Sequence, residues 1–456
     1  MSKIINFFNT LSNKREQFFP INKKKIGMYV CGPTVYDFPH IGNARPLVVF
    51  DVLFRFFRKL WGATNVTYVR NITDIDDKII ESAKKNKRSI QELTKTIINS
   101  FHEDCIYLNC LNPTNEPKAT EHLKGMIDMV SNLLKNNHAY ENKKHVYFSV
   151  SSFKKYGKLS NKNSEQLIAG SRVEVSKYKK DPLDFVLWKP SNEQDPGWNS
   201  PWGRGRPGWH LECSVMSEKF LGKQFDIHGG GLDLIFPHHE NEIAQSCCSN
   251  KTENFANFWM HNGFVTFNKE KMSKSLGNIV TVNKLKEKVN GQVVRFALLS
   301  SHYKQPLDWN EKLIQASQNT LNRWYDLYDE KIDSKEIYSV NTNYMDPLFE
   351  DLNTPEYIAH LHYLYDKAYK GDKISKLQFL AGCKQIGLLE EDKQSWKNFK
   401  KFKAQVDENF INQKIKDRND ARKKENYKLA DAIRKELEDN GVIIEDKQEE
   451  TLWKYK

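Results

Sequence analysis

The length, composition and charge of the chain exclude whole classes of protein. With 456 residues, of which 39% are hydrophobic, the chain is long enough for three or four domains with real cores. No apolar run approaches the length of a membrane span, and the opening residues lack the apolar core of a signal peptide. We therefore expect a protein that is neither membrane-spanning nor secreted.

The net charge of +12 and the pI near 9.0 fit a polyanionic partner, and nucleic acid is the first candidate. A lysine-rich background composition would produce the same excess, so the charge alone carries little weight. The seven cysteines are odd in number and lack the spacing of a disulfide framework. This predicts a reducing, cytoplasmic location in which some thiols serve as metal ligands.

The first elements predicted along the chain are a buried strand over 26–31, a helix over 44–61 and a second strand over 65–70. Strand, helix and strand in this order begin a parallel α/β sheet, where ligands bind at the carboxyl ends of the strands. Cys31 stands at such an end. Residues from about 80 to 140 follow a helical pattern.

Residues 145–190 change character, with short β-like pieces among polar turns, and predict an insertion between two halves of the sheet. The elements expected after it are a loop over 190–208, a helix over 211–220, a strand over 225–228 that feeds a glycine turn, and a strand over 255–261. From about 310 onward, helical periodicity predicts a bundle core.

The C-terminal part of the chain separates its charges. Residues 397–435 hold 13 Lys and Arg against 6 Asp and Glu, whereas residues 436–456 hold 3 against 7. The basic charge therefore lies on one predicted helical hairpin, and residues 441–446 are expected to form a strand. Most charges on such a hairpin belong to a solvated helix with ion pairs four residues apart.

Residues 228–242, HGGGLDLIFPHHENE, combine three kinds of chemistry. The three glycines permit close approach of backbone to a ligand, and Pro237 is expected to open a helix. On that helix His238 and Glu242 face the same way, as two zinc ligands would. Cys31 and Cys213 are the best candidates to complete the set. Buried cysteines and a satisfied histidine are the alternative, which explains one such residue better than four together.

Two further motifs indicate phosphate binding. His40-Ile41-Gly42-Asn43 follows a strand and opens a helix, whose free N–H groups and dipole favour an anion. A capping turn with a structural histidine is the alternative. Residues 271–275, KMSKS, place two lysines on a polar loop that could clamp a triphosphate in the transition state. A solvated charged loop is the alternative, and it loses weight once both motifs occur together.

This pair resembles the two signature motifs of class I aminoacyl-tRNA synthetases. Further stretches are similar to the cysteinyl-tRNA synthetase family: 28–37 (MYVCGPTVYD), 70–78 (RNITDIDDK), 207–214 (PGWHLECS) and 228–242. The resemblance runs from Ile5 to Trp453. The first motif of class I enzymes usually ends in histidine, whereas position 43 is asparagine here, which can still donate a hydrogen bond.

The resemblance implies a cysteine–tRNA ligase that uses ATP with Mg²⁺, L-cysteine and tRNA(Cys). Zinc is expected on Cys31, Cys213, His238 and Glu242, with His239 as a competitor for His238, and would select the substrate as a thiolate. The remaining expected roles are catalysis by His40, Lys271 and Lys274; ATP binding by His40, Gly42, Asn43, Gly230, Asp233 and Lys274; and the cysteine pocket by Thr73 and Trp209. A plain core role for Trp209 is the alternative.

The basic tail resembles the anticodon-binding end of the family. There Arg422 could read a guanine edge, Asp431 could accept from a cytosine amino group and Tyr427 could stack on a base. Two rival functions stand beside this one. The first is a cysteine ligase with a small amine acceptor, which has no use for such a tail. The second is a tRNA-binding protein without catalysis, which needs neither the lysine loop nor the zinc set.

The fold expected is therefore α/β: a Rossmann-like parallel-sheet catalytic domain with an insertion, then a helical bundle and a small α+β anticodon-binding domain, in a monomer. The expected division is 1–140 and 196–265 for the two catalytic halves, 141–195 for the insertion, 266–312 for the lysine-loop and stem-contact region, 313–396 for the bundle and 397–456 for the anticodon domain.

Overall fold

The computed structural model describes residues 3–162, 166–167, 177–272, 276–328, 332, 336–337, 340–403, 406–447 and 451–455. The chain forms two compact units, which are described separately. The first comprises residues 1–284, 298–310 and 342–360, and the second comprises 285–297, 311–341 and 361–456. Within the described ranges, every helix is too short or too polar to cross a bilayer.

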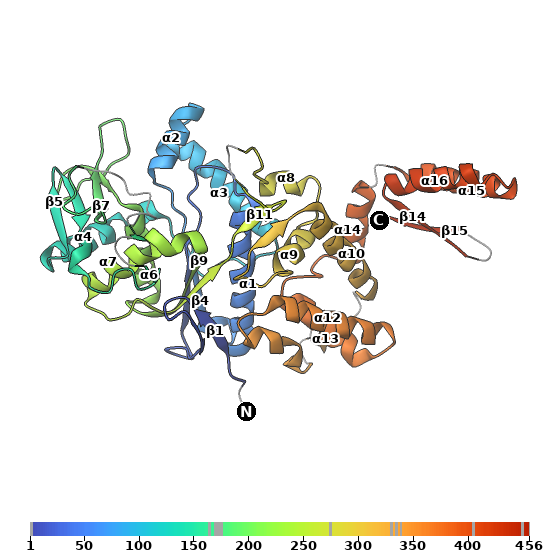
Figure 1. Cartoon of the computed structure of the whole chain (residues 1–456), viewed down its shortest axis with the longest axis horizontal. Helices are drawn as coiled ribbons and strands as arrows, with labels where there is room; N and C mark the ends of the chain where they lie inside the picture. The colour runs from blue at the N-terminus through green and yellow to red at the C-terminus, as the bar shows by residue number, and fades with distance from the viewer. Residues whose placement is uncertain are drawn as a thin grey trace. The chain divides into compact units, whose positions relative to one another are not determined.

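A four-stranded parallel sheet forms the centre of the first unit (Figure 1). Its strand order is β10 (Ala256–Asn262), β9 (Phe225–Gly231), β3 (Ile26–Val30) and β4 (Val66–Arg70). All three pairings are parallel. The predicted α/β class and its strands are thereby confirmed. Parallel strands place their carboxyl ends along one edge, and the site lies at that edge.

The glycine turn predicted at 229–231 is wrong, because these glycines are the last three residues of β9 and pair with Met260, His261 and Asn262 of β10. Their missing side chains make room for packing instead. A Cβ on Gly229 would lie 2.4 Å from the ring of Phe50. The glycine thus lets the helix that carries Phe50 pack directly on the strand.

That helix, α1 (Ile41–Trp61), begins three residues before the predicted start, immediately after His40. The helix expected to open at Pro237 also differs from its prediction. A π turn covers Ile235–His239, and the regular helix α7 runs over Glu240–Asn250. Phe236 has φ −137° and ψ 131°, because a residue before proline is pushed out of the helical region. The helix α6 (Trp209–Leu221) agrees with its prediction.

A four-stranded antiparallel sheet includes the stretch expected as an insertion and extends beyond it on both sides. Its strands are β5 (Ala139–Asn142), β6 (His145–Phe148), β7 (Phe185–Pro190) and β8 (Gly205–Pro207). The stretch expected as loop therefore contains a strand, β8. Gly205 makes the pairing possible, since a Cβ there would lie 2.4 Å from Nε1 of Trp188.

Shorter elements complete the first unit and lead into the second. A hairpin pairs β1 (Asn6–Asn9) with β2 (Lys14–Gln17), and a small sheet has the order β12 (Glu270–Lys271), β11 (Val265–Phe267), β13 (Leu307–Trp309). The remaining helices are α2 (Asp77–Asn86), α3 (Ile90–Tyr107), α4 (Leu123–Lys135) and α8 (Val282–Lys286).

The helical region expected after residue 310 is confirmed. Its helices are α10 (Glu311–Leu327), α12 (Thr354–Tyr369), α13 (Lys373–Gln385) and α14 (Lys393–Lys403), and α9 (Gly291–Leu299) precedes this region. In the core of the second unit, buried Trp324 makes edge contacts with Phe296 and Phe379. Trp324 lies within the region where helical periodicity predicts a bundle core.

The chain ends in a small α+β substructure. The helices α15 (Glu408–Lys423) and α16 (Tyr427–Asp439) form the predicted helical hairpin, and β14 (Val442–Asp446) pairs antiparallel with β15 (Thr451–Tyr455). It has its own apolar cluster, made by Ile411, Ile415, Ile433, Leu437, Val442 and Ile444.

Candidate active site and metal centre

A cleft of about 1520 Å³ opens at the carboxyl edge of the parallel sheet. Its walls combine residues far apart in sequence: the start of α1 with His40 and Gly42, the start of α6 with Trp209, and Lys271. Cys31, at the end of β3, also lines it. The first phosphate motif, the described start of the second and one expected metal ligand, Cys31, therefore line one cavity.

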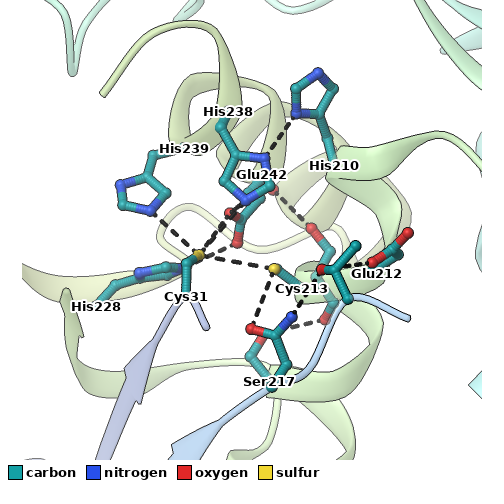
Figure 2. Close-up of polar contacts among 12 residues, drawn as sticks. Cys31, His210, Glu212, Cys213, Ser217, His228, His238, His239 and Glu242 are labelled. Atoms are coloured by element: carbon teal, nitrogen blue, oxygen red, sulfur yellow. Dashed lines mark hydrogen bonds and ion pairs between the residues drawn. The ribbon is translucent and has the colours of Figure 1, made fainter. Parts of the chain in front are cut away.

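The four predicted ligands meet at this cleft (Figure 2). Cys31 Sγ lies 3.7 Å from Cys213 Sγ, 3.5 Å from His238 Nε2 and 3.5 Å from Glu242 Oε1. His238 Nε2 and Glu242 Oε1 are 2.9 Å apart, as their spacing of four residues across the π turn and α7 predicted. All of these ligand atoms lie within 4.8 Å of one another.

These separations fit zinc. Two sulfurs about 2.3 Å from a tetrahedral ion are about 3.8 Å apart, and a sulfur and a nitrogen are about 3.6 Å apart. The observed 3.7 Å between the sulfurs and 3.5 Å from sulfur to the imidazole come close to both values. Only the His238–Glu242 pair is tighter, because the two side chains share a direct hydrogen bond.

A second, overlapping set is Cys31, His228, His239 and Glu242. His239 Nε2 lies 3.4 Å from Cys31 Sγ, so the competition expected between His239 and His238 has a geometric basis. Both sets need Cys31 and Glu242 and so exclude each other. His239 Nδ1 is held by His261 Nε2 at 2.8 Å, whereas His228 Nε2 bonds Glu242 Oε2 at 2.9 Å.

The charges in the cluster depend on one another. Burial alone would raise the pKa of Glu242, but His228 and His238 hold it at about 2. Burial alone would lower the pKa of His238, but Glu242 raises it to about 10. Burial and the neighbouring Cys213 raise the pKa of the Cys31 thiol well above its ordinary value. Without a metal cation the site cannot carry two thiolates. Ligation by both cysteines therefore requires such a cation.

Three histidines around the cluster were not predicted as site residues. His210 Nδ1 lies 2.9 Å from His238 Nδ1, and His228 bonds Glu242, so each orients a proposed ligand. His261 links His239 to Thr10 Oγ1. For His261 the signal in the sequence was its position near the carboxyl end of its strand, whereas His228 lies in the middle of β9.

The first phosphate motif caps α1. His40 Nδ1 accepts a hydrogen bond from Gly42 N at 3.1 Å, and Asn43 Oδ1 accepts one from His40 N at 3.1 Å. The capping alternative is therefore present in the structure. It occupies Nδ1 of His40 and the amide oxygen of Asn43, so phosphate contacts by these residues fall to His40 Nε2 and Asn43 Nδ2.

The second phosphate motif is described in part. Lys271 is exposed at the end of β12, whereas Lys274, with Ser273 and Ser275, lies outside the described residues. Met272 approaches the first motif: a Cβ on Gly42 would stand 3.4 Å from its terminal methyl. Beyond the loop, Val280 O accepts a hydrogen bond from Ile41 N at 2.9 Å. The described start of the second motif therefore lies beside Gly42 of the first.

The two residues expected at the cysteine pocket, Trp209 and Thr73, differ in their place relative to the cleft. Trp209 lines the cleft and stacks on His238, with ring centroids 4.2 Å apart. Thr73 is buried and donates from its hydroxyl to Glu212 Oε2 at 3.0 Å. Burial and the nearby Cys213 raise the pKa of Glu212 well above its ordinary value. Thr73 therefore holds the first turn of α6 through Glu212.

The residues expected at ATP near the glycines also differ in exposure. Gly230 is buried in β9, where a Cβ would stand 2.9 Å from the His239 ring. Asp233 is exposed and lines the cleft. Of this pair, only Asp233 offers a side chain to a ligand in the cleft.

In the C-terminal substructure, the two residues expected to contact the anticodon, Arg422 and Asp431, differ in their surroundings. Arg422 Nη1 lies 3.2 Å from Asp446 Oδ2. Asp446 also binds Arg418 through two hydrogen bonds of 2.8 Å. Asp431 is exposed on α16. An RNA contact by Arg422 would therefore compete with an internal ion pair.

Comparisons with known proteins give the family of the chain. Residues 17–319 match the family described as tRNA synthetases class I (C) catalytic domain. A cysteine–tRNA ligase of Pelagibacter ubique (strain HTCC1062) is 57% identical over 456 residues, which cover 100% of both chains. The cysteine–tRNA ligase of Wolbachia pipientis subsp. Culex pipiens (strain wPip) is 49% identical over 99% of this chain and 98% of its own.

Solved structures give the fold. The Mycobacterium tuberculosis methionyl-tRNA synthetase in complex with methionyl-adenylate superposes with a TM-score of 0.58 at 13% identity, covering 82% of this chain and 93% of its own. With the class I catalytic domain matched over most of the chain and full-length relatives of up to 57% identity among those compared, the chain belongs to the cysteine–tRNA ligase family of class I aminoacyl-tRNA synthetases.

Proposed function

We propose that this enzyme activates L-cysteine with ATP and transfers it to the 3′ end of tRNA(Cys). In the first step the cysteine carboxylate attacks the α-phosphate of ATP, and pyrophosphate leaves with Mg²⁺. In the second step a ribose hydroxyl of the terminal adenosine attacks the cysteinyl-adenylate and AMP leaves. The protein contributes position and charge stabilisation rather than covalent catalysis.

One observation carries the proposal: through Cys31, the metal-type donor set adjoins the cleft that the start of α1 and Lys271 also line. Cys31, Cys213, His238 and Glu242 would hold zinc, which binds the substrate thiolate and prefers it to the hydroxyl of serine. A difference of one atom is hard to reject in an apolar pocket. The donor set therefore supports selection of cysteine at the activation step.

Around that centre the protein's own groups have separate tasks. Trp209, which stacks on His238 and lines the cleft, would form the wall beside the substrate side chain. The start of α1, with His40, Gly42 and Asn43, would receive ATP through its free N–H groups and dipole. Lys271 and Lys274 would meet the phosphates as charge develops in the transition state.

ATP–pyrophosphate exchange with the purified full-length chain tests the first step. We expect exchange that depends on L-cysteine and is far weaker with L-serine at equal concentration. Exchange with neither amino acid would contradict the proposal and favour a tRNA-binding protein without catalysis.

A charging assay with tRNA(Cys) tests the second step and separates the enzyme from a cysteine ligase with a small amine acceptor. The basic helical hairpin at the C-terminus favours tRNA as the acceptor. Exchange without charging of tRNA(Cys), under conditions in which the tRNA is intact, would favour the amine acceptor.

A further inference from the structure

Arg45 lies on α1, two residues after the first phosphate motif, and is fully buried at 0% exposure. Its guanidinium donates three hydrogen bonds to backbone carbonyls. Nη1 reaches Gly263 O and Phe264 O, both at 3.0 Å, and Nη2 reaches His302 O at 3.1 Å. A planar fork with several fixed donors suits such an array of carbonyl oxygens.

The surroundings of Arg45 are unusual for a buried cation. Among the residues that the structure describes, no carboxylate forms an ion pair with it, and its Nε has no hydrogen-bond partner. Burial lowers the pKa of Arg45 to about 10. A buried charge without a counterion destabilises a fold. The carbonyl contacts are therefore the interactions that offset this penalty.

Two of those carbonyls, of Gly263 and Phe264, belong to the segment that enters the lysine loop. Gly263 and Phe264 precede β11, which pairs with β12, and β12 ends at Lys271. The segment that leaves the loop is also tied to the start of α1, because Ile41 N donates to Val280 O and Val282 N donates to Pro39 O, both at 2.9 Å. One helix end thus holds both ends of the loop.

We propose that Arg45 is a positioning residue that fixes the lysine loop relative to His40 for adenylate formation. Arg45 touches no substrate and acts through the backbone of Gly263 and Phe264, which line the cleft. This inference rests on the proposed function, because it concerns the geometry of the phosphate groups. It predicts that the loss of Arg45 affects the ATP step and leaves cysteine binding intact.

The test uses Arg45→Met and Arg45→Lys in the full-length, metal-loaded enzyme. Arg55→Met is the matched control, since Arg55 stands on the same helix and binds Asp51 Oδ2 and Asn109 O instead. We expect Arg45→Met to lower the rate constant of exchange by about tenfold to a hundredfold, the effect of a displacement near 1 Å. Arg45→Lys should fall between, because an ammonium keeps the charge but not the fork.

Two readouts separate positioning from loss of folding. The dissociation constant for cysteine should stay within about twofold of wild type, whereas amide hydrogen exchange in β11 and β12 should accelerate in Arg45→Met and not in Arg55→Met. In a double-mutant cycle, Lys271→Ala should cost much less in the Arg45→Met background than in wild type.

Additive effects of Arg45→Met and Lys271→Ala, or exchange kinetics in both Arg45 variants equal to wild type, would overturn this inference alone. A wild-type enzyme without cysteine-dependent exchange would overturn the proposed function together with it. If Arg45→Met fails to fold, Arg45→Lys decides the question by the same cycle and the same amide exchange.

Discussion

Neighbouring groups set the pKa values of single side chains at the carboxyl edge of the sheet. Cys213 illustrates this: burial alone would raise the pKa of its thiol, yet Cys31 and His238 bring it to about 6. Cys383 is equally buried in the second unit, and there burial raises the pKa well above the ordinary value. The same residue type is thus a ligand candidate in one place and an inert core residue in the other.

Cys213→Ser should therefore lose the metal, whereas Cys383→Ser should keep it. We expect metal analysis to give close to one zinc per chain for wild type and for Cys383→Ser, and far less for Cys213→Ser. Serine is a poor zinc ligand because its hydroxyl stays protonated. A metal-free wild-type protein with full cysteine activation would contradict the zinc assignment.

Lys274→Ala should slow adenylate formation far more than it weakens cysteine binding. The removal of one charge aimed at a transition state typically lowers the rate by about a hundredfold or more. Pre-steady-state formation of adenylate measures the rate, and calorimetry measures the cysteine affinity. Normal exchange kinetics in this variant would show that the loop only covers the surface.

At the scale of elements, α1 packs directly against β9 because Gly229 of β9 has no side chain. The glycines at the end of β9 extend a strand that other residues would also form, but a Cβ at Gly229 would occupy the position of the Phe50 ring. Both elements carry site residues, since His40 caps α1 and His228 lies on β9. Their close packing therefore sets the geometry of the cleft.

Gly229→Ala should destabilise the first unit by about 1–3 kcal/mol, the usual effect of overpacking a well-filled core. The added methyl group would lie 2.4 Å from Phe50 unless the helix or the ring moves. The shift of the urea midpoint measures the effect. Phe50→Leu in the same chain should recover part of the loss, and two purely additive destabilisations would contradict this account.

At the scale of the whole molecule, the C-terminal substructure has a core of its own that shares no residue with the proposed catalytic centre. The helix α14 does not belong to that core, because its Trp396 stacks on Tyr325 of α10 with centroids 4.3 Å apart. We therefore place the cut that separates activation from tRNA binding after α14, at residue 403.

A chain that ends at residue 403 should still make cysteinyl-adenylate and should charge tRNA poorly, mainly through a higher apparent KM for tRNA. Arg422→Ala should act in the same direction by about 1–3 kcal/mol if it contacts a base. Exchange and charging assays on the same preparations measure both. Loss of adenylate formation with normal tRNA affinity would show that this division of labour is wrong.

The ion pair of Asp446 makes the C-terminal substructure sensitive to acid. The hydrogen bonds from Arg418 lower the pKa of Asp446 to about 2, below the value of about 3.9 in an unfolded chain. The stabilisation is therefore present above about pH 4 and is lost as pH falls toward 2. Amide exchange in β14, compared between wild type and Asp446→Asn, should show protection that differs at pH 6 and converges near pH 2.

The elements that periodicity predicted well are those whose local pattern agrees with their burial. The strand over 26–31, the helix over 44–61 and the helices after 310 carry apolar residues at the spacing that their own geometry requires. The four metal-ligand candidates were likewise nameable, because their residue types and their places at strand and helix ends indicate the chemistry.

Tertiary contacts alone determined the rest. Three consecutive glycines favour a turn by their own conformational freedom, whereas their pairing with β10 makes them a strand. The roles of His228, His210 and Arg45 depend on partners between 14 and 257 residues away in sequence. A local pattern specifies which chemistry a residue can perform, whereas the fold decides which distant groups it meets, because those distances are set by how helices and strands pack.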